Sequence, residues 1–427
     1  MIKLFVLSDL GVSSGYGRIA AEIMNRVYKR GVDVFAASVM YDGKLPAQYE
    51  GKQFPYWVGV ARPMIPGTMY DLDGVINMIN AYQPDIIHVI QDFPFAMWLR
   101  DAPLDWSKFG FMITTPVDGA PIYPKWIDLA QKADALLTIS QYGVNAFREQ
   151  GVKARLCLPA ANLDDFYPLP PDERLAIRAK LGIEPDAFVM GMVAMNQGRK
   201  AIPQTLYTFF EFTKDKPNAR LLMNMDAVSP AGWDIPALCQ QHGWDVGKII
   251  FKIDAVRRGV TELRERYNVM DVHSVLSYRE GFGLPLVEGM ACGVLTAAMD
   301  YSSGTEIVGE GRGILVKATP YFHLSTWGGA ADKLSDYNDY IRQLQHFYDH
   351  KEDAAATAKR GMEWARGYTW DMAADATMTT IQEIMERRKK ATPAPVMPVP
   401  TPPPPAVEVA PPKAEPELEL IETEKAG

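Results

Sequence analysis

The chain alternates short β-rich runs with helical patterns in two successive series, and this alternation limits its fold more than any other feature. The predicted strands of the first series are 2–9, 32–39, 84–91, 109–118, 133–140 and 154–160. Those of the second series are 186–194, 219–226, 248–255, 272–278, 294–300 and 312–317. Strands that alternate with helices form parallel sheets covered on both faces. We therefore predict an α/β protein with two Rossmann-like domains that face each other across a cleft.

The predicted boundaries follow from where the two series begin and end. The first domain spans 1–168 and the second 169–370. A C-terminal helix, 371–390, is expected to pack back toward the first domain. Residues 391–427 are dominated by Pro, Glu, Val and Ala, with no aromatic residue, and such a segment buries too little apolar surface to order itself. We expect a disordered Pro/Glu-rich tail, which is either a solvated extension without a partner or a tether for a Pro-motif-binding partner.

Composition excludes several classes of protein. The 427 residues carry a formal net charge of -8, so the strongly basic footprint of a dedicated nucleic-acid binder is missing. The three cysteines lie far apart, which predicts neither a zinc site nor a disulfide framework and fits the reducing cytoplasm. The apolar N-terminus is read as a first strand rather than a signal peptide, and no apolar run is long enough to predict an integral membrane segment.

The strongest motif is YREGFGLPLVEGMACG, residues 278–293, which follows a predicted buried strand. Its glycines let backbone amides approach a ligand, and a helix that starts after them presents free N–H groups that suit a phosphate. Glu280 precedes the loop and Glu288 lies inside the helix. Because a carboxylate beside a pyrophosphate is unfavourable unless it accepts hydroxyl hydrogens, the two glutamates point to sugar hydroxyls.

The stretch 267–300 closely resembles the signature of the retaining GT-B glycosyltransferases of family 4, which carry E-G-F-G-L-P and then E-A-M-A-x-G. Weaker motifs agree in order over almost the whole chain: SGYGRIAAEI (14–23), FYPLP (166–170), GMVAMNQGRKA (191–201) and YTWDMAA (368–374). The resemblance implies a divergent member with an acceptor-side first domain and a nucleotide-sugar-binding second domain.

The resemblance also implies roles for single residues. Glu280 would be catalytic and contact the hydroxyls of the transferred sugar, whereas Glu288 would hold the ribose of the donor nucleotide. Gly283 and Leu284 would present amides to the sugar or the phosphates.

Two basic residues complete the donor side. Arg199 and Lys200 would neutralise the donor diphosphate, since cations aimed at a departing diphosphate stabilise the transition state. Taken alone, such a pair after a strand is commonly a solvated loop.

Other positions are less specific. Gly15 is assigned to the diphosphate and Gly17 is a weaker candidate beside it, although G-x-G before a helix is also a tight turn. Val117 stands where many members have a His, and the adjacent Asp118 is predicted to be catalytic, as an acceptor or sugar contact, with a turn-capping Asp as the alternative.

A second loop departs from the family pattern. Where relatives carry a Gly-Gly pair, this chain has Ser302-Ser303, and Ser303, Gly304 and Thr305 are further candidates to bind phosphate through hydroxyls and amides.

We therefore predict a hexosyltransferase-type enzyme that moves a sugar from a nucleoside-diphosphate sugar to an acceptor hydroxyl with retention, without a metal or cofactor. UDP and GDP stay undecided, and the acceptor is open among carbohydrate, lipid, small molecule and modified DNA. The alternatives are an inactive nucleotide-sugar-binding scaffold that recruits partners through its Pro-rich tail, and another enzyme of this fold such as a phosphorylase or epimerase.

Overall fold

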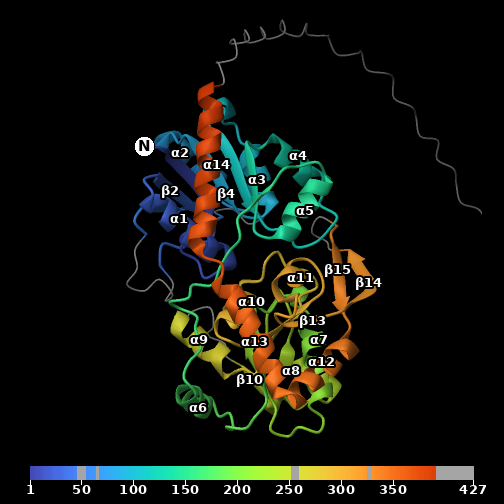
Figure 1. Ribbon diagram of the computed structural model, residues 1–427. Coiled ribbons are helices and arrows are strands. Elements are labelled where there is room, and N and C mark those ends of the chain that lie inside the picture. Colours follow the sequence, from blue (N-terminus) through green and yellow to red (C-terminus); the bar gives the residue numbers. More distant parts are fainter. Residues whose placement is uncertain (46–53, 64–66, 252–258, 325–328, 391–427) are drawn as a thin grey trace, which may run out of the picture. The chain divides into compact units, whose positions relative to one another are not determined.

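The computed structural model describes residues 1–45, 54–63, 67–251, 259–324 and 329–390 (Figure 1). The strands of these residues form two parallel sheets and one antiparallel hairpin. The seven-stranded sheet contains β1 (Lys3–Ser8), β2 (Asp33–Ser38), β3 (Trp57–Val60), β4 (Ile86–Ile90), β5 (Gly110–Thr115), β6 (Ala135–Thr138) and β7 (Arg155–Leu156). The six-stranded sheet contains β8 (Val189–Val193), β9 (Arg220–Asn224), β10 (Ile249–Phe251), β11 (Val272–Val275), β12 (Leu295–Met299) and β13 (Ile314–Val316). The hairpin pairs β14 (Ala318–Leu324) with β15 (Ala331–Ser335).

Helices alternate with the strands as predicted. Those that follow strands of the first sheet are α1 (Gly15–Lys29), α2 (Leu72–Tyr82), α3 (Phe93–Arg100), α4 (Pro124–Lys132) and α5 (Gln141–Glu149). The second sheet is accompanied by α6 (Pro171–Lys180), α7 (Ile202–Phe212), α8 (Ile235–His242), α9 (Val260–Val269), α10 (Leu284–Ala291), α11 (Ser303–Val308), α12 (Tyr337–Asp349) and α13 (Lys351–Arg366). The last helix is α14 (Trp370–Lys390). Each predicted strand is present with shorter bounds, although 252–255 of one prediction lie outside the described residues.

Alternate side chains of the strands pack into two different hydrophobic cores, which explains why the strands are apolar throughout. Leu4 and Val6 of β1 point into one cluster and Phe5 and Leu7 into the other, all four fully buried. This period of two is what a sheet covered on both faces requires. The cluster on the α1 side continues into the second sheet and α10, so the two sheets share one continuous core.

The strand orders place a switch in direction at the centre of each sheet. The first sheet runs β3-β2-β1-β4-β5-β6-β7 and the second β10-β9-β8-β11-β12-β13. The switch points lie between β1 and β4 and between β8 and β11. Ligands of open α/β sheets bind outside the carboxyl ends of the strands at such points, so the loops after these four strands are the first place to look for a site.

The long C-terminal helix α14 returns to the first sheet, beside α1 and β4 in Figure 1. Arg155 of β7 donates to Thr380 at 2.7 Å, and Arg388 donates to the carbonyl of Phe109 at 2.9 Å. Residues Met1–Arg388 thus form one compact unit that contains both sheets. The predicted tail, 391–427, lies outside the described residues.

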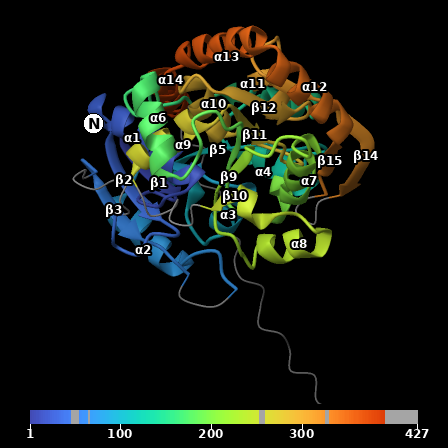
Figure 2. The same cartoon turned by 90° about the horizontal axis from the view of Figure 1, so that it is seen from below.

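Close packing between α10 and α13 holds the motif helix in the second half of the chain, and Figure 2 shows the two helices side by side. A Cβ on Gly361 of α13 would lie 3.3 Å from the Met290 side chain of α10. In α10, a Cβ on Gly289 would lie 2.8 Å from Nδ1 of the buried His273. The glycine that replaces the family alanine therefore makes room for this histidine ring.

Three strands were not predicted. β3 is a short, partly exposed edge strand, and β14 and β15 form a hairpin between β13 and α12. The hairpin is fixed to both halves of the unit, because Ala331 donates to the carbonyl of Ala120 at 2.9 Å and Lys333 to that of Tyr278 at 3.0 Å. The hairpin is held in place by tertiary contacts, and no strong local sequence pattern indicated it.

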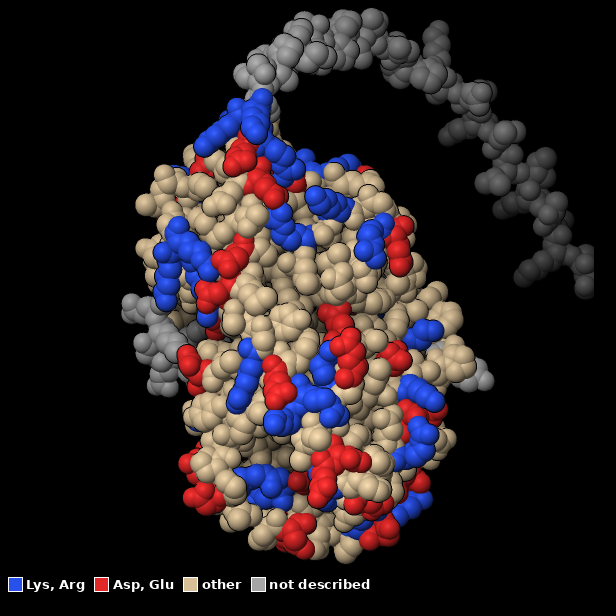
Figure 3. Space-filling model, viewed as in Figure 1, with Lys and Arg blue, Asp and Glu red and all other residues tan. Residues whose placement is uncertain are grey.

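Acidic and basic side chains are interspersed on the face shown in Figure 3, which therefore carries no continuous basic stripe. Of the helices that the structure describes, none is long and apolar enough to cross a membrane.

Candidate active site

Glu280 lies at the switch point of the second sheet, where the loops after β8 and β11 meet. Lys200 Nζ lies 2.5 Å and Arg199 Nη1 3.4 Å from Glu280 Oε2, and the Ser277 hydroxyl donates to the same oxygen at 3.0 Å. Within the described ranges, Glu280 Oε1 accepts no hydrogen bond from a protein group. The predicted sugar ligand and the predicted diphosphate ligands are thus brought together, with one carboxylate oxygen left open.

The cations determine the protonation of this glutamate. Burial alone would raise the pKa of Glu280, but Lys200 and Arg199 outweigh it and hold the pKa at about 2. Burial lowers the pKa of Lys200, and Glu280 opposes that shift. Since an ionised carboxylate only accepts hydrogen bonds, the open oxygen suits a hydroxyl donor.

The loop before α10 has a backbone conformation that requires glycine at position 283. Gly283 has φ +89, and a Cβ there would lie 2.8 Å from Leu286 Cδ1. Leu284 is the first residue of α10, with Pro285 in the first turn, where its missing N–H costs nothing. The two residues predicted to offer amides therefore lie at the helix N-terminus next to Glu280.

Glu288 is less accessible than its predicted role requires. Its side chain is 2% exposed, and Tyr267 donates to Oε2 at 2.8 Å. Arg18 of α1 forms an ion pair with Oε1. A ribose that reached this glutamate would have to displace Arg18, a partner that the sequence did not indicate.

The start of α1 distinguishes the two predicted glycines. Gly15 is the exposed first residue of the helix. Gly17 donates its amide to the Ser14 hydroxyl at 2.9 Å, and a Cβ on it would lie 2.2 Å from the carbonyl oxygen of Val12. Close packing under the N-cap accounts for Gly17, whereas Gly15 stays at the surface of the loop.

Asp118, which follows β5, is part of an ion-pair chain between the two halves of the unit. Arg279 Nε lies 3.0 Å from Asp118 Oδ2, and the same guanidinium pairs with Asp332 of β15. His323 Nε2 lies 3.0 Å from the other oxygen of Asp332. Arg279 directly precedes Glu280 in the chain, so this ion pair brings Asp118 near Glu280.

The Ser302-Ser303 loop forms hydrogen bonds with the backbone of the Glu280 loop. Ser303 is fully buried and donates its hydroxyl to the carbonyls of Glu280 and Phe282, at 2.8 and 3.0 Å. Thr305 is exposed and donates to Asp300 at 2.8 Å. Gly304 is required by packing, since a Cβ would lie 2.3 Å from the carbonyl of Met299. The Ser303 hydroxyl is therefore committed to the motif loop rather than turned toward a phosphate.

A glutamate that the sequence analysis passed over joins the two sheets at this loop. Glu306 of α11 accepts hydrogen bonds from the backbone amides of Gln141 and Tyr142, at 3.1 and 2.8 Å. These amides are the first two of α5, so Glu306 stabilises that helix N-terminus as a capping carboxylate does.

Sequence reasoning also missed Tyr16, Asp92, Arg18 and Arg279. Asp92 follows β4 at the switch point of the first sheet and accepts a hydrogen bond from the Tyr16 hydroxyl at 2.5 Å. The one available signal was position, because Gln91-Asp92 directly follows a predicted buried strand.

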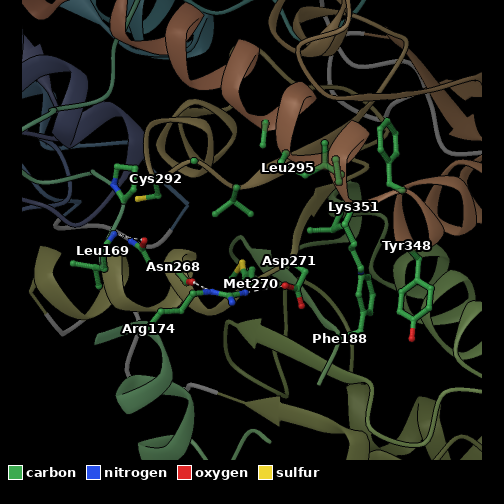
Figure 4. A pocket seen from close by; sticks show the side chains of 18 residues that line it. Leu169, Arg174, Phe188, Asn268, Met270, Asp271, Cys292, Leu295, Tyr348 and Lys351 are labelled. Atoms are coloured by element: carbon green, nitrogen blue, oxygen red, sulfur yellow. Dashed lines mark hydrogen bonds and ion pairs between the residues drawn. The ribbon is translucent and has the colours of Figure 1, made fainter. Parts of the chain in front are cut away.

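The pocket drawn in Figure 4 lies at the opposite edge of the second sheet. It has a volume of about 280 Å³ and is lined by Phe188, Asp271 and Leu295, which lie at the amino ends of β8, β11 and β12. Arg174 points across it to Asp271 at 2.8 Å. It is separate from the carboxyl-edge site of Glu280.

The two fully buried histidines are core residues. His88 and His273 are fully buried, and burial lowers the pKa of each to about 3. Among the described residues, no three His, Cys, Asp or Glu side chains gather in a way that could hold a metal ion.

The two facing parallel sheets define the GT-B class of folds, and solved structures agree. Sucrose-phosphate synthase from Thermosynechococcus elongatus superposes with a TM-score of 0.69 at 17% identity, over 91% of this chain and 100% of that one. HepE from Anabaena in complex with UDP and glucose gives a TM-score of 0.67 at 15% identity, over 90% and 100% of the chains. The predicted GT-B fold is confirmed.

Sequence comparisons point to the same class. Residues 256–322 match the family "Glycosyl transferases group 1". D-inositol 3-phosphate glycosyltransferases from Kineococcus radiotolerans and Stackebrandtia nassauensis are each 27% identical, over 54% and 60% of this chain and 52% and 56% of their own length. The chain thus spans about half the length of the curated relatives it matches. The predicted resemblance to this glycosyltransferase family is confirmed, at the low identity of a divergent relative.

Proposed function

We propose that this protein is a glycosyltransferase that moves a sugar from a nucleoside-diphosphate sugar to an acceptor hydroxyl, with retention and without a metal ion. The donor diphosphate lies against Arg199 and Lys200 and the N-terminus of α10, while Glu280 accepts hydrogen bonds from the sugar. As the diphosphate leaves, the two cations stabilise the charge that develops on it. The departing phosphate oxygen takes the proton of the acceptor hydroxyl on the same face of the sugar.

One observation carries the proposal: Glu280 has one oxygen bound to the two cations and the other open. A carboxylate placed between cations and an open space can bind a neutral sugar while its neighbours bind the phosphates. A structural ion pair alone would not require the glycine loop and the helix N-terminus beside it.

The nucleotide and the acceptor are chosen from what the relatives suggest. A neighbour of this fold is described in complex with UDP-glucose, and we propose UDP as the first nucleotide to test, with GDP as the second. The name of the curated relatives contains D-inositol 3-phosphate, which makes a cyclic polyol the first candidate acceptor. No observation favours a phosphorylase, an epimerase or an inactive scaffold.

The deciding experiment is calorimetric titration of the full chain with UDP, GDP and their sugar conjugates, without added metal. We expect one nucleotide to bind and its sugar conjugate to be hydrolysed slowly. Lys200→Ala should weaken binding of that nucleotide about tenfold, because a buried cation on the diphosphate is lost. The matched control is Lys214→Ala, an exposed lysine on the same half of the chain, 69% exposed and paired with Glu211.

Two results would contradict the proposal. Binding of no nucleotide by a folded sample would remove the donor site altogether. Equal affinity of wild type and Lys200→Ala would leave Lys200 as a partner of Glu280 without a role at the diphosphate.

A further inference from the structure

Asp92 occupies the position in the first sheet that corresponds to the position of Glu280 in the second. β4 lies between β1 and β5, and Asp92 follows it at the switch point, just as Glu280 follows β11. The residue is open to solvent. A polar side chain at this edge, opposite a donor-binding edge, lies where a second substrate would enter.

Tyr16 holds one oxygen of Asp92 and leaves the other available. The phenol of Tyr16, in the first turn of α1, donates to Asp92 Oδ1 at 2.5 Å. Within the parts of the chain that the structure describes, no group donates a hydrogen bond to Oδ2. Asp9, on the neighbouring strand end, differs: Gln91 and Ser14 occupy both of its oxygens, at 2.6 and 3.0 Å. Asp9 is therefore structural, while Asp92 has an oxygen to offer.

The surroundings of Asp92 connect it to the donor residues. Although Asp92 reaches solvent, the protein atoms packed around its carboxyl withdraw it in part from water and raise its pKa. Asp118 adds to that shift, while Tyr16, Arg199 and Arg279 oppose it. Arg199 is the same guanidinium that lies 3.4 Å from Glu280. Arg199 thus acts electrostatically on both carboxylates.

The charges on this side favour a neutral partner. Asp92 and Asp118 are both carboxylates, and the two cations that act on Asp92 are already engaged, Arg199 with Glu280 and Arg279 with Asp118 and Asp332. In its ionised form, Asp92 accepts hydrogen bonds and donates none, so it fits a hydroxyl and repels a phosphate. A like charge brought against this carboxylate would disfavour a phosphorylated partner.

We propose that Asp92 is an acceptor-binding residue: its open carboxylate oxygen accepts a hydrogen bond from a hydroxyl of the acceptor and selects a group that is neutral at that position over a phosphorylated one. The inference rests on the proposed transferase function. Tyr16 is a positioning residue that keeps the carboxylate turned toward the acceptor.

The test uses water as the acceptor, so that no natural acceptor is needed. Hydrolysis of UDP-glucose by the full chain, or of GDP-mannose if GDP is the nucleotide that binds, is measured for wild type, Asp92→Asn and Tyr16→Phe. Asp92→Asn should lower kcat at least tenfold and leave the Kd of the nucleoside diphosphate within twofold. Tyr16→Phe should lower kcat about threefold. The control is Asp101→Asn, an exposed aspartate at the other end of α3, which should leave both values unchanged.

Inorganic phosphate then probes the charge of the acceptor position. At saturating donor, phosphate should inhibit hydrolysis by Asp92→Asn at least fivefold more strongly than hydrolysis by wild type, because the repelling carboxylate is gone.

The proposal for Asp92 would be overturned if Asp92→Asn hydrolysed the donor as fast as wild type or lost nucleotide affinity in parallel with kcat. Equal inhibition constants of phosphate for wild type and Asp92→Asn would also overturn it. So would a wild type that binds the nucleotide but does not hydrolyse its sugar conjugate. A wild type that binds no nucleotide contradicts the proposed transferase itself, so the two failures are distinguishable.

Discussion

The carboxyl edges of the two sheets have the same topology and opposite chemistry. At the second sheet, Arg199 and Lys200 surround Glu280. At the first sheet lie two carboxylates, Asp92 and Asp118, and Asp118 pairs with Arg279 of the second half of the chain. Under our two proposals, the same strand order prepares one edge for a diphosphate and the other for a hydroxyl, because the loops and not the strands carry the charge.

The largest test of this comparison removes the charge at the centre of the donor edge. Glu280→Gln should lower turnover of the donor sugar by about 10²–10³-fold, the size typical for loss of one aligned charged contact. Nucleotide affinity should change far less, since the diphosphate ligands stay. Steady-state kinetics and calorimetry on the same sample give both values. Glu363→Gln, at an exposed side chain of α13, serves as the control. Equal turnover in wild type and Glu280→Gln would remove Glu280 from the reaction.

Acid should weaken the donor edge in a defined range. The pKa of Glu280 is lowered to about 2 from an ordinary value of 4.5, so its folded form binds fewer protons than the unfolded chain between these values. Its contribution to the free energy of unfolding is present above about pH 5. It is lost as the pH falls toward 2, and amounts to about 3 kcal/mol at 1.36 kcal/mol per pKa unit.

Urea unfolding at a series of pH values measures this contribution. The difference between wild type and Glu280→Gln should be constant from pH 7 to 5 and shrink toward zero below. A difference that does not depend on pH would mean that Lys200 and Arg199 do not hold the ionised form.

The link between the edges is the next test. Arg279→Gln leaves the buried Asp332 without its guanidinium and separates Asp118 from the second half of the chain. We expect the free energy of unfolding to fall by about 2–3 kcal/mol, near the lower end for breaking a buried pair. Arg279→Lys, which keeps the charge but not the fork, should lose less. Denaturant unfolding of the two variants compares them, and equal stability with wild type would exclude the link.

The smallest expected effect concerns Arg18, which crosses from the first half of the chain to Glu288. If Glu288 holds the ribose, Arg18→Ala should strengthen UDP binding about threefold, because the nucleotide no longer displaces the arginine. The gain should be smaller for 2′-deoxy-UDP, which keeps only the 3′-hydroxyl as a donor to Glu288. Calorimetric titration with both nucleotides measures this difference, and an equal change for the two would separate Glu288 from the ribose.

The sequence by itself determined the strands of both sheets, since continuous apolar runs between helical patterns have few other folds. It also predicted which residues gather at the carboxyl edge of the second sheet, because EGFGLP, the two glutamates and the Arg-Lys pair are local patterns whose chemistry depends on neighbours in the chain. Gly283 could be read in advance, because a backbone at φ +89 needs a residue without a Cβ.

Only the tertiary structure decided which partners these residues meet. Arg18 and Glu288 are separated by 270 positions, and Asp118 and Arg279 by 161, so no local pattern could pair them. The same holds for Tyr16 with Asp92, 76 residues apart, and for the hairpin β14–β15 at the interface of the two halves. Ion pairs and hydrogen bonds form between side chains that the fold brings within about 3 Å, and that proximity is a property of the packed sheets rather than of the sequence around each residue.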